Sequence, residues 1–186
     1  MDLILRNMLH QALRNILIDR CEVLKLACEQ RSKFEGWLKF ELAFALSNCS
    51  DTSELVLEDS YPSNGRSDFS FVYKNEKYFV EMKTANTNWR VAGVENLHRP
   101  VTKNISGIIE DIQVLQTKSP PAHGLAVFVI FPIPERLLRE TPAQLEFHLD
   151  RIERETIFEK GSLQKTMEFV PISEGYGVSV FVVNVI

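Results

Sequence analysis

The chain has few of the features that mark disulfide-rich, zinc-binding or membrane proteins. Its three cysteines, Cys21, Cys28 and Cys49, are odd in number and form no Cys-x-x-Cys pair, so neither a disulfide framework nor a zinc site is expected. No apolar run approaches the length of a membrane span, and the acidic start between Met1 and Arg6 does not resemble a signal peptide. We therefore expect a reduced, cytoplasmic protein without a membrane partner.

Positive charge and histidine are also scarce. The formal net charge is -4, from 21 Lys and Arg against 25 Asp and Glu, which lowers long-range attraction to nucleic-acid phosphate. The four histidines, His10, His98, His123 and His148, have no carboxylate or cysteine at ligand spacing. None of them is expected to serve as a general base or as a zinc ligand.

What the chain does contain fits one α/β domain. Its 186 residues are 45% hydrophobic, with neither a repeat nor a long polar linker. We expect a helical extension over residues 1–31, a core over 32–132, and a C-terminal helix and hairpin over 133–186. Leu3 to Gln30 has apolar residues at helical spacing and predicts one long helix or two. Leu125 to Phe131 (LAVFVIF) predicts a strand buried on both faces.

Two segments rich in aromatic and β-branched residues predict a β-hairpin. They are Asp68 to Tyr73 (DFSFVY) and Lys77 to Lys83 (KYFVEMK), and residues 75–76 are expected to form a two-residue turn between them. If Lys74 pairs with Lys77, then Asp68 lies opposite Lys83.

Alternation along this hairpin places four polar residues, Asp68, Ser70, Glu81 and Lys83, on one face of the sheet. Opposed residues lie about 5 Å apart at Cβ and diagonal ones roughly 7 Å, so Asp68 and Glu81 can share a metal ion. The simpler alternative is a surface ion pair between Asp68 and Lys83, worth at most about 1 kcal/mol. From Asp68 and Lys83 alone, the surface ion pair is the preferred interpretation. The surrounding sequence raises the odds of the metal site.

A helix predicted upstream, from Ser32 to Leu46, contains two glutamates. Glu41 falls on the apolar stripe of this helix, where an ionised carboxylate needs a metal ion or a contact such as Lys83, and both alternatives stay open. Glu35 completes a Ser32-x-x-Glu35 capping box, so it is assigned to structure.

Over residues 32–132 the sequence resembles the PD-(D/E)xK nuclease superfamily, which has a restriction-endonuclease-like core. The resemblance rests on the order of the segments FEGWLKFELAFAL, SELVLED, GRSD, FVEMKT and GLAVFVIFP. It implies a central mixed β-sheet flanked by helices in αβββαβ order. It also implies that Asp68 and Glu81 bind metal, that Lys83 is catalytic, and that Glu41 is the helical glutamate of some members. The proline that usually precedes the aspartate is replaced by Ser67.

The implied activity is metal-dependent hydrolysis of phosphodiester bonds, with DNA as the expected substrate. Oxygen ligands with open positions suit Mg²⁺ or Mn²⁺, and the backbone carbonyl of Met82 is a further candidate ligand. The metal would generate hydroxide from a bound water, while Lys83 orients that water or stabilises developing negative charge.

Several basic residues surround the proposed centre in the sequence: Arg66, Arg90, Arg99 and Lys103. They are candidates for binding nucleic acid, with Trp89 free to stack on a base or to fill the core, although scattered cations are more often a solvated surface. Two alternatives share the fold without catalysis. One is a nucleic-acid-binding module, and the other is a protein-interaction subunit in which residues 3–30 form an interface. A homodimer is compatible with each reading.

Overall fold

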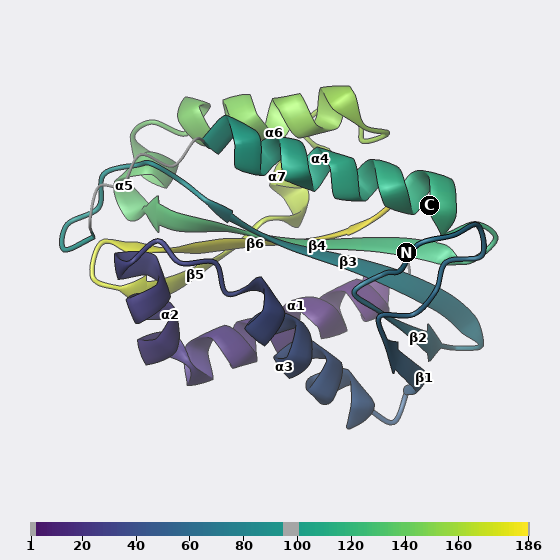
Figure 1. The fold of residues 1–186 in the computed structure, drawn as a ribbon. Coiled ribbons are helices and arrows are strands. Elements are labelled where there is room, and N and C mark those ends of the chain that lie inside the picture. The colour runs from purple at the N-terminus through teal and green to yellow at the C-terminus, as the bar shows by residue number, and fades with distance from the viewer. Residues whose placement is uncertain (1–2, 95–100, 186) are drawn as a thin grey trace.

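The computed structural model describes residues 3–94 and 101–185 and has an α/β fold, a six-stranded mixed sheet between two layers of helices (Figure 1). The helices are α1 Leu3–Asp19, α2 Cys21–Glu29, α3 Glu35–Ser47, α4 Val101–Lys118, α5 Glu135–Arg139, α6 Ala143–Glu155 and α7 Ser162–Thr166. The strands are β1 Thr52–Leu57, β2 Phe69–Tyr73, β3 Glu76–Asn86, β4 His123–Pro134, β5 Glu168–Ser173 and β6 Tyr176–Asn184.

The strands lie in the order β1-β2-β3-β4-β6-β5, and β3 and β4 are the parallel pair. A parallel pair requires a crossover, which α4 supplies. Every residue of β4 after His123 is buried, which confirms the prediction of a strand covered on both faces. From α3 to β4 the elements follow the αβββαβ order that the sequence predicted.

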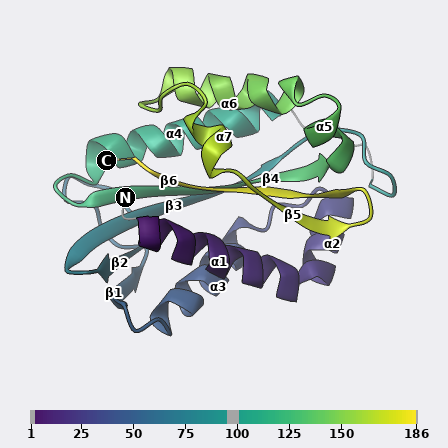
Figure 2. The same cartoon turned by 180° about the vertical axis from the view of Figure 1, so that it is seen from behind.

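Each face of the sheet is covered by its own helical layer, with α1, α2 and α3 on one side and α4, α6 and α7 on the other (Figures 1 and 2). Apolar residues at helical spacing place the two longest helices. Leu5, Leu9, Leu13 and Leu17 of α1 are buried in one core, and the isoleucines of α4 are buried in the other. The segment 3–30 is therefore two helices, one of the two predicted forms, and it covers a face of the sheet.

The predicted hairpin forms, but its turn lies one residue earlier than expected. Tyr73 pairs with Glu76, and the turn residues Lys74 and Asn75 have φ angles of 49° and 65°. Such a two-residue turn with two positive φ angles matches the twist of the flanking strands. The expected pairing of Lys74 with Lys77 is wrong. The pairing is displaced by two residues, an even number, so each side chain keeps its predicted face.

The predicted C-terminal hairpin is confirmed as β5 and β6, and it extends the central sheet because β6 pairs with β4. None of the helices in the described part of the chain combines the length and apolar character that a membrane crossing requires.

Candidate active site

The candidate site is a notch at the edge of β3, formed because β3 is longer than β2. The pairing of the two strands ends at Phe69 and Val80, while β3 continues to Asn86. Extending this register by one residue places Asp68 opposite Glu81. The backbone amide of Met82 then has no strand partner on this edge, and it donates to Oδ2 of Asp68 at 2.7 Å.

The start of α3 closes the notch. Glu35, the first residue of that helix, accepts a hydrogen bond from the backbone amide of Thr84 at its Oε2 atom, at 2.9 Å. Lys39, one turn further along α3, places its Nζ 3.4 Å from Oδ1 of Asp68. Two carboxylates thus take the place of a neighbouring strand along the free edge of β3.

Lys83 projects from β3 toward α4 and lies between two carboxyl groups. Its Nζ is 2.9 Å from Oδ2 of Asp111 and 3.8 Å from Oε1 of Glu35. Burial favours the neutral amine, but the hydrogen bond and charge of Asp111 outweigh it and raise the pKa of Lys83. Lys83 therefore keeps its positive charge at neutral pH.

Glu81 is half-buried beside Asp68. The buried Tyr61 donates a hydrogen bond from its hydroxyl to Oε1 of Glu81, at 2.5 Å. Burial raises the pKa of Glu81 to about 8, and the charges of Asp68 and Asp111 add to this, while the Tyr61 hydrogen bond opposes it. Burial and neighbouring carboxylates likewise raise the pKa of Asp111 to about 6, although Lys83 opposes the shift.

The charges in this cluster are unequal. Four carboxyl groups, those of Glu35, Asp68, Glu81 and Asp111, face two ammonium groups, those of Lys39 and Lys83. The side chains of Glu35, Asp68 and Asp111 are between 22% and 31% exposed, so solvent and solutes reach the cluster. Because a pKa of about 8 leaves Glu81 mostly protonated at neutral pH, the excess is one carboxylate, and a divalent cation would relieve it and favour ionisation of Glu81. Carboxylate oxygens are the ligands that Mg²⁺ and Mn²⁺ prefer.

The donors do not form a ready-made coordination sphere. Within residues 3–94 and 101–185, no group of three or more His, Cys, Asp or Glu side chains has the spacing of a metal site. Asp68 and Glu35 point instead at backbone amides of β3. The amide and carbonyl groups of one strand residue point to the same edge of the strand. The Met82 carbonyl, a predicted ligand, therefore lies on the free edge of β3 with the Met82 amide.

The structure does not bring Glu41 to this cluster. Glu41 accepts a hydrogen bond from Nε1 of Trp37 at 3.1 Å and lies 4.0 Å from Nε of Arg20. It follows Glu35 by six residues, which is about 9 Å along the helix and about 240° around it. The two glutamates therefore face different surroundings.

Glu35 is the glutamate that α3 presents to the notch, and the predicted capping box does not form. The helix begins at Glu35 itself, after Phe34, and no side chain caps its first turn. A capping box needs the helix to begin near Ser32, three residues earlier.

The predicted nucleic-acid contacts come from three different segments of the chain. Arg66 is exposed, with Nη1 3.7 Å from a carboxylate oxygen of Glu58, and Lys103 is exposed on the first turn of α4. Arg90 is exposed in the segment that follows β3. Arg99 falls outside the described residues.

Sequence reasoning missed Asp111, although its position carried a signal. Asp111 follows Ile108 by three residues and precedes Leu115 by four, and both isoleucine and leucine are buried. A carboxylate on the core-facing stripe of a helix requires a partner. Tyr61 lies in the irregular segment between β1 and β2, where no periodicity reveals its partner.

Comparisons of the chain with protein-family models, with curated proteins and with solved structures gave no significant match. The chemistry of the notch is therefore interpreted from its own residues.

Proposed function

We propose that the chain is a metal-dependent nuclease of the PD-(D/E)xK type with a restriction-endonuclease-like core, hydrolysing phosphodiester bonds of nucleic acid, with DNA as the expected substrate. The observation that carries this proposal is the convergence of Asp68, Glu81 and Lys83 at one edge of β3, beside Glu35. The order of elements from α3 to β4 supports the proposed core.

Asp68 and Glu81, with Glu35 and the Met82 carbonyl, are the groups that would hold Mg²⁺ or Mn²⁺. When bound, the ion would supply a water of lowered pKa and would neutralise charge on the phosphate. Tyr61 fixes the Glu81 carboxylate through its hydrogen bond.

Lys83 supplies positive charge that does not depend on the metal. Its ammonium group is protonated at neutral pH and stabilises the negative charge that develops on the phosphate oxygens. In the reaction, a water oxygen forms a bond to phosphorus, the bond from phosphorus to the leaving oxygen breaks, and the leaving oxygen takes a proton. Asp111 and Glu35 hold the lysine between β3, α3 and α4.

A catalytically inactive module of the same fold, binding nucleic acid or protein, is the second candidate. The ion pair between Lys83 and Asp111 favours it, because the ammonium group is already occupied at 2.9 Å.

Cleavage assays separate the two candidates. Labelled single-stranded and duplex DNA and RNA are incubated with the chain over a titration of Mg²⁺ and Mn²⁺. We expect metal-dependent cleavage that is lost in Lys83→Ala, Asp68→Asn and Glu81→Gln. Glu41→Gln is the matched control and retains cleavage. Binding without cleavage under both metals would favour the inactive module.

A further inference from the structure

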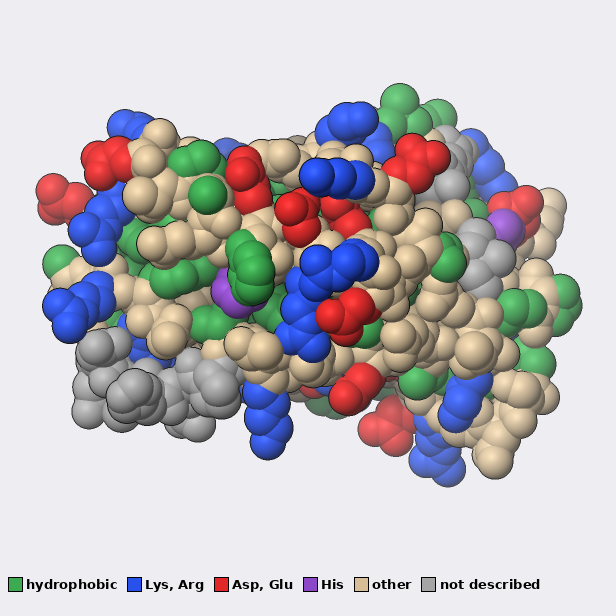
Figure 3. Space-filling model, turned by 90° about the horizontal axis from the view of Figure 1, so that it is seen from above, with side chains coloured by type: hydrophobic (Ala, Val, Ile, Leu, Met, Phe, Trp, Pro, Cys, Tyr) green, Lys and Arg blue, Asp and Glu red, His purple; other side chains and the backbone are tan. Residues whose placement is uncertain are grey.

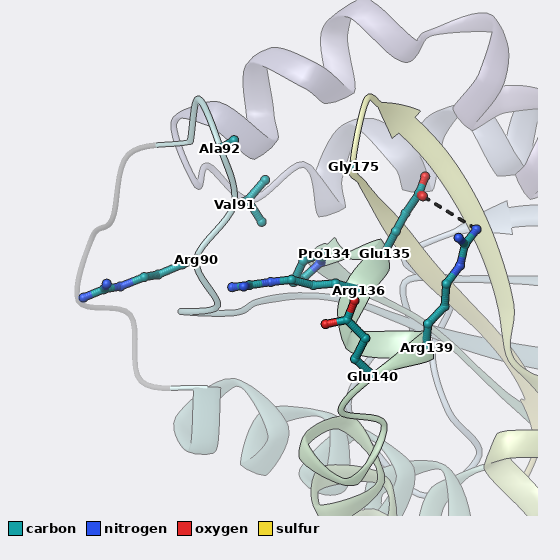
Figure 4. Close-up of a pocket in the computed structure, with 9 residues that line it drawn as sticks. All are labelled: Arg90, Val91, Ala92, Pro134, Glu135, Arg136, Arg139, Glu140 and Gly175. Atoms are coloured by element: carbon teal, nitrogen blue, oxygen red, sulfur yellow. Dashed lines mark ion pairs between the residues drawn. The ribbon is translucent and has the colours of Figure 1, made fainter.

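A polar cavity lies beyond the carboxyl ends of β3 and β4, and its lining contains none of the residues of the notch. It has a volume of about 650 Å³, and its lining includes Arg90, Arg136 and Arg139 (Figure 4). An adjoining hollow of about 320 Å³ shares Arg90 and Arg136 and adds Trp89 and Gln144. We call the two together the arginine groove. Its walls come from the segment after β3, from α5 and from the start of α6.

The arginines of the groove differ in how their charges are balanced. Nη2 of Arg139 lies 4.0 Å from Oε2 of Glu135, and a dashed line joins this pair in Figure 4. No ion pair involving Arg90 or Arg136 is found between described residues, and both side chains extend in the same direction in Figure 4. With Glu140 also in the lining, the groove contains three arginines and two glutamates, which leaves it with one net positive charge.

Seen from above, the surface over α4 and α6 carries interspersed positive and negative side chains (Figure 3). In a chain of net charge -4, attraction for an anion must therefore come from a local cluster of cations.

The segment that carries Arg90 is held firmly in place. The buried Arg31 donates hydrogen bonds to the carbonyl oxygens of Thr87 and Trp89, the second at 2.9 Å. Thr87 also bonds to β4, through its amide to Phe131 at 2.7 Å and through its hydroxyl to Pro132 at 2.6 Å. A binding surface that is ordered before the ligand arrives costs less entropy on binding.

The chemistry of the groove suits a nucleotide within a strand. Guanidinium groups bind phosphate through paired hydrogen bonds, and aromatic side chains stack on bases. Trp89 supplies an aromatic ring and Gln144 an amide beside Arg90 and Arg136. We infer that the arginine groove binds a phosphate and its neighbouring base in the nucleic-acid strand whose scissile bond lies in the notch. This inference rests on the proposed nuclease function.

The distance between the two sites limits the length of substrate that can reach both. Arg90 follows Lys83 by seven residues, so their Cα atoms are at most about 25 Å apart. Each strand of a duplex advances 3.4 Å per nucleotide, so at most about seven base pairs are needed to span this distance. A substrate that extends about seven base pairs on one side of the cut is therefore long enough to reach the groove, and we expect shorter substrates to gain less from it.

The test compares long and short duplexes in the double variant Arg90→Gln/Arg136→Gln. The long duplex extends about ten base pairs on each side of the cut and the short one about four. For the long duplex we expect KM to rise about tenfold and the slope of log affinity against log salt to fall by about one per arginine, with kcat unchanged. For the short duplex KM stays the same. The control Arg6→Gln/Arg20→Gln removes the same charge from α1 and from the residue between α1 and α2, and neither arginine lines the groove.

Trp89 provides a direct signal of occupancy. The chain has two tryptophans, so Trp37→Phe leaves Trp89 as the single fluorophore. We expect the long duplex to change its fluorescence and inorganic phosphate to leave it unchanged at millimolar concentration. A response to inorganic phosphate together with none to the long duplex would assign the groove to a small anion and overturn the inference.

Two further results separate the inference from the function on which it rests. Binding is measured without turnover in Lys83→Ala, with circular dichroism to verify folding of each variant. Binding that depends on length and is lost with the two arginines, together with no cleavage by the wild-type chain in Mg²⁺ or Mn²⁺, would retain the groove and reject the nuclease. Cleavage of the long duplex with equal KM in Arg90→Gln/Arg136→Gln would retain the nuclease and reject the groove.

Discussion

The notch and the arginine groove lie along the same strand but have opposite charge. At the notch, four carboxyl groups surround two lysines, and the groove contains three arginines and two glutamates. After Val80, the backbone amides on the free edge of β3 donate hydrogen bonds to the carboxylates of Asp68 and Glu35. The segment after Asn86 is held instead by a hydrogen bond from the buried Arg31 to a backbone carbonyl. The net charge of -4 is therefore the sum over the whole chain of an acidic site, a basic site and the remaining surface.

The largest expected effect concerns the notch. If the chain is the proposed nuclease, Lys83→Ala and Asp68→Asn should each lower kcat by on the order of a thousandfold, because each would remove a group proposed to act on the reacting phosphate or to hold the metal. Single-turnover cleavage of a labelled duplex measures the effect. A loss confined to KM would assign these residues to binding and erase the functional difference between notch and groove.

The second largest effect is a difference in kcat between substitutions of the two glutamates of α3. Glu35→Gln should lower kcat by about ten- to a hundredfold, since Glu35 faces Lys83 and the free edge of β3. Glu41→Gln should retain activity within about twofold, because Glu41 contacts Trp37 and Arg20 instead. Paired kinetics of the two variants measure this, and a larger loss in Glu41→Gln would contradict the assignment.

Asp111→Asn should have a smaller effect on turnover. It keeps the shape of the side chain but removes the charge that holds Lys83, so we expect kcat to fall about tenfold while KM for the long duplex stays constant. Asp111→Glu restores a carboxylate and should recover part of kcat. Equal kcat in all three proteins would show that Asp111 does not position the lysine.

The smallest effect is on stability. Glu81 has its pKa raised from 4.5 to about 8 and Asp111 from 3.8 to about 6, so the folded protein binds protons more tightly than the unfolded chain. This stabilisation is complete below pH 4 and is lost as pH rises through about 6 and then about 8. Without metal, Tm should therefore fall by a few degrees across this range. Mg²⁺ should reduce the fall, and Glu81→Gln should remove most of it, as differential scanning calorimetry would measure.

The sequence predicted the faces of the hairpin but not its pairing. Alternation at a period of two places Asp68 and Glu81 on one face whichever even register is adopted. The register itself depends on Lys74 and Asn75 accepting positive φ angles, which composition indicates only weakly.

The helical contributions to the notch were harder to predict. Glu35 matched a capping pattern, and its true role depends on the helix beginning three residues after Ser32. Asp111 lies 28 residues after Lys83, and only the crossover from β3 through α4 to β4 brings the two together. Local patterns contain no information on such a contact until the packing of α4 on the sheet is known.

The most direct test of the central claim is calorimetric titration of Mn²⁺ into the chain without nucleic acid. The account predicts saturable binding that is lost in Asp68→Asn and in Glu81→Gln and retained in Glu41→Gln. Binding that survives both substitutions in the notch, or no binding by a chain that is correctly folded, would contradict it.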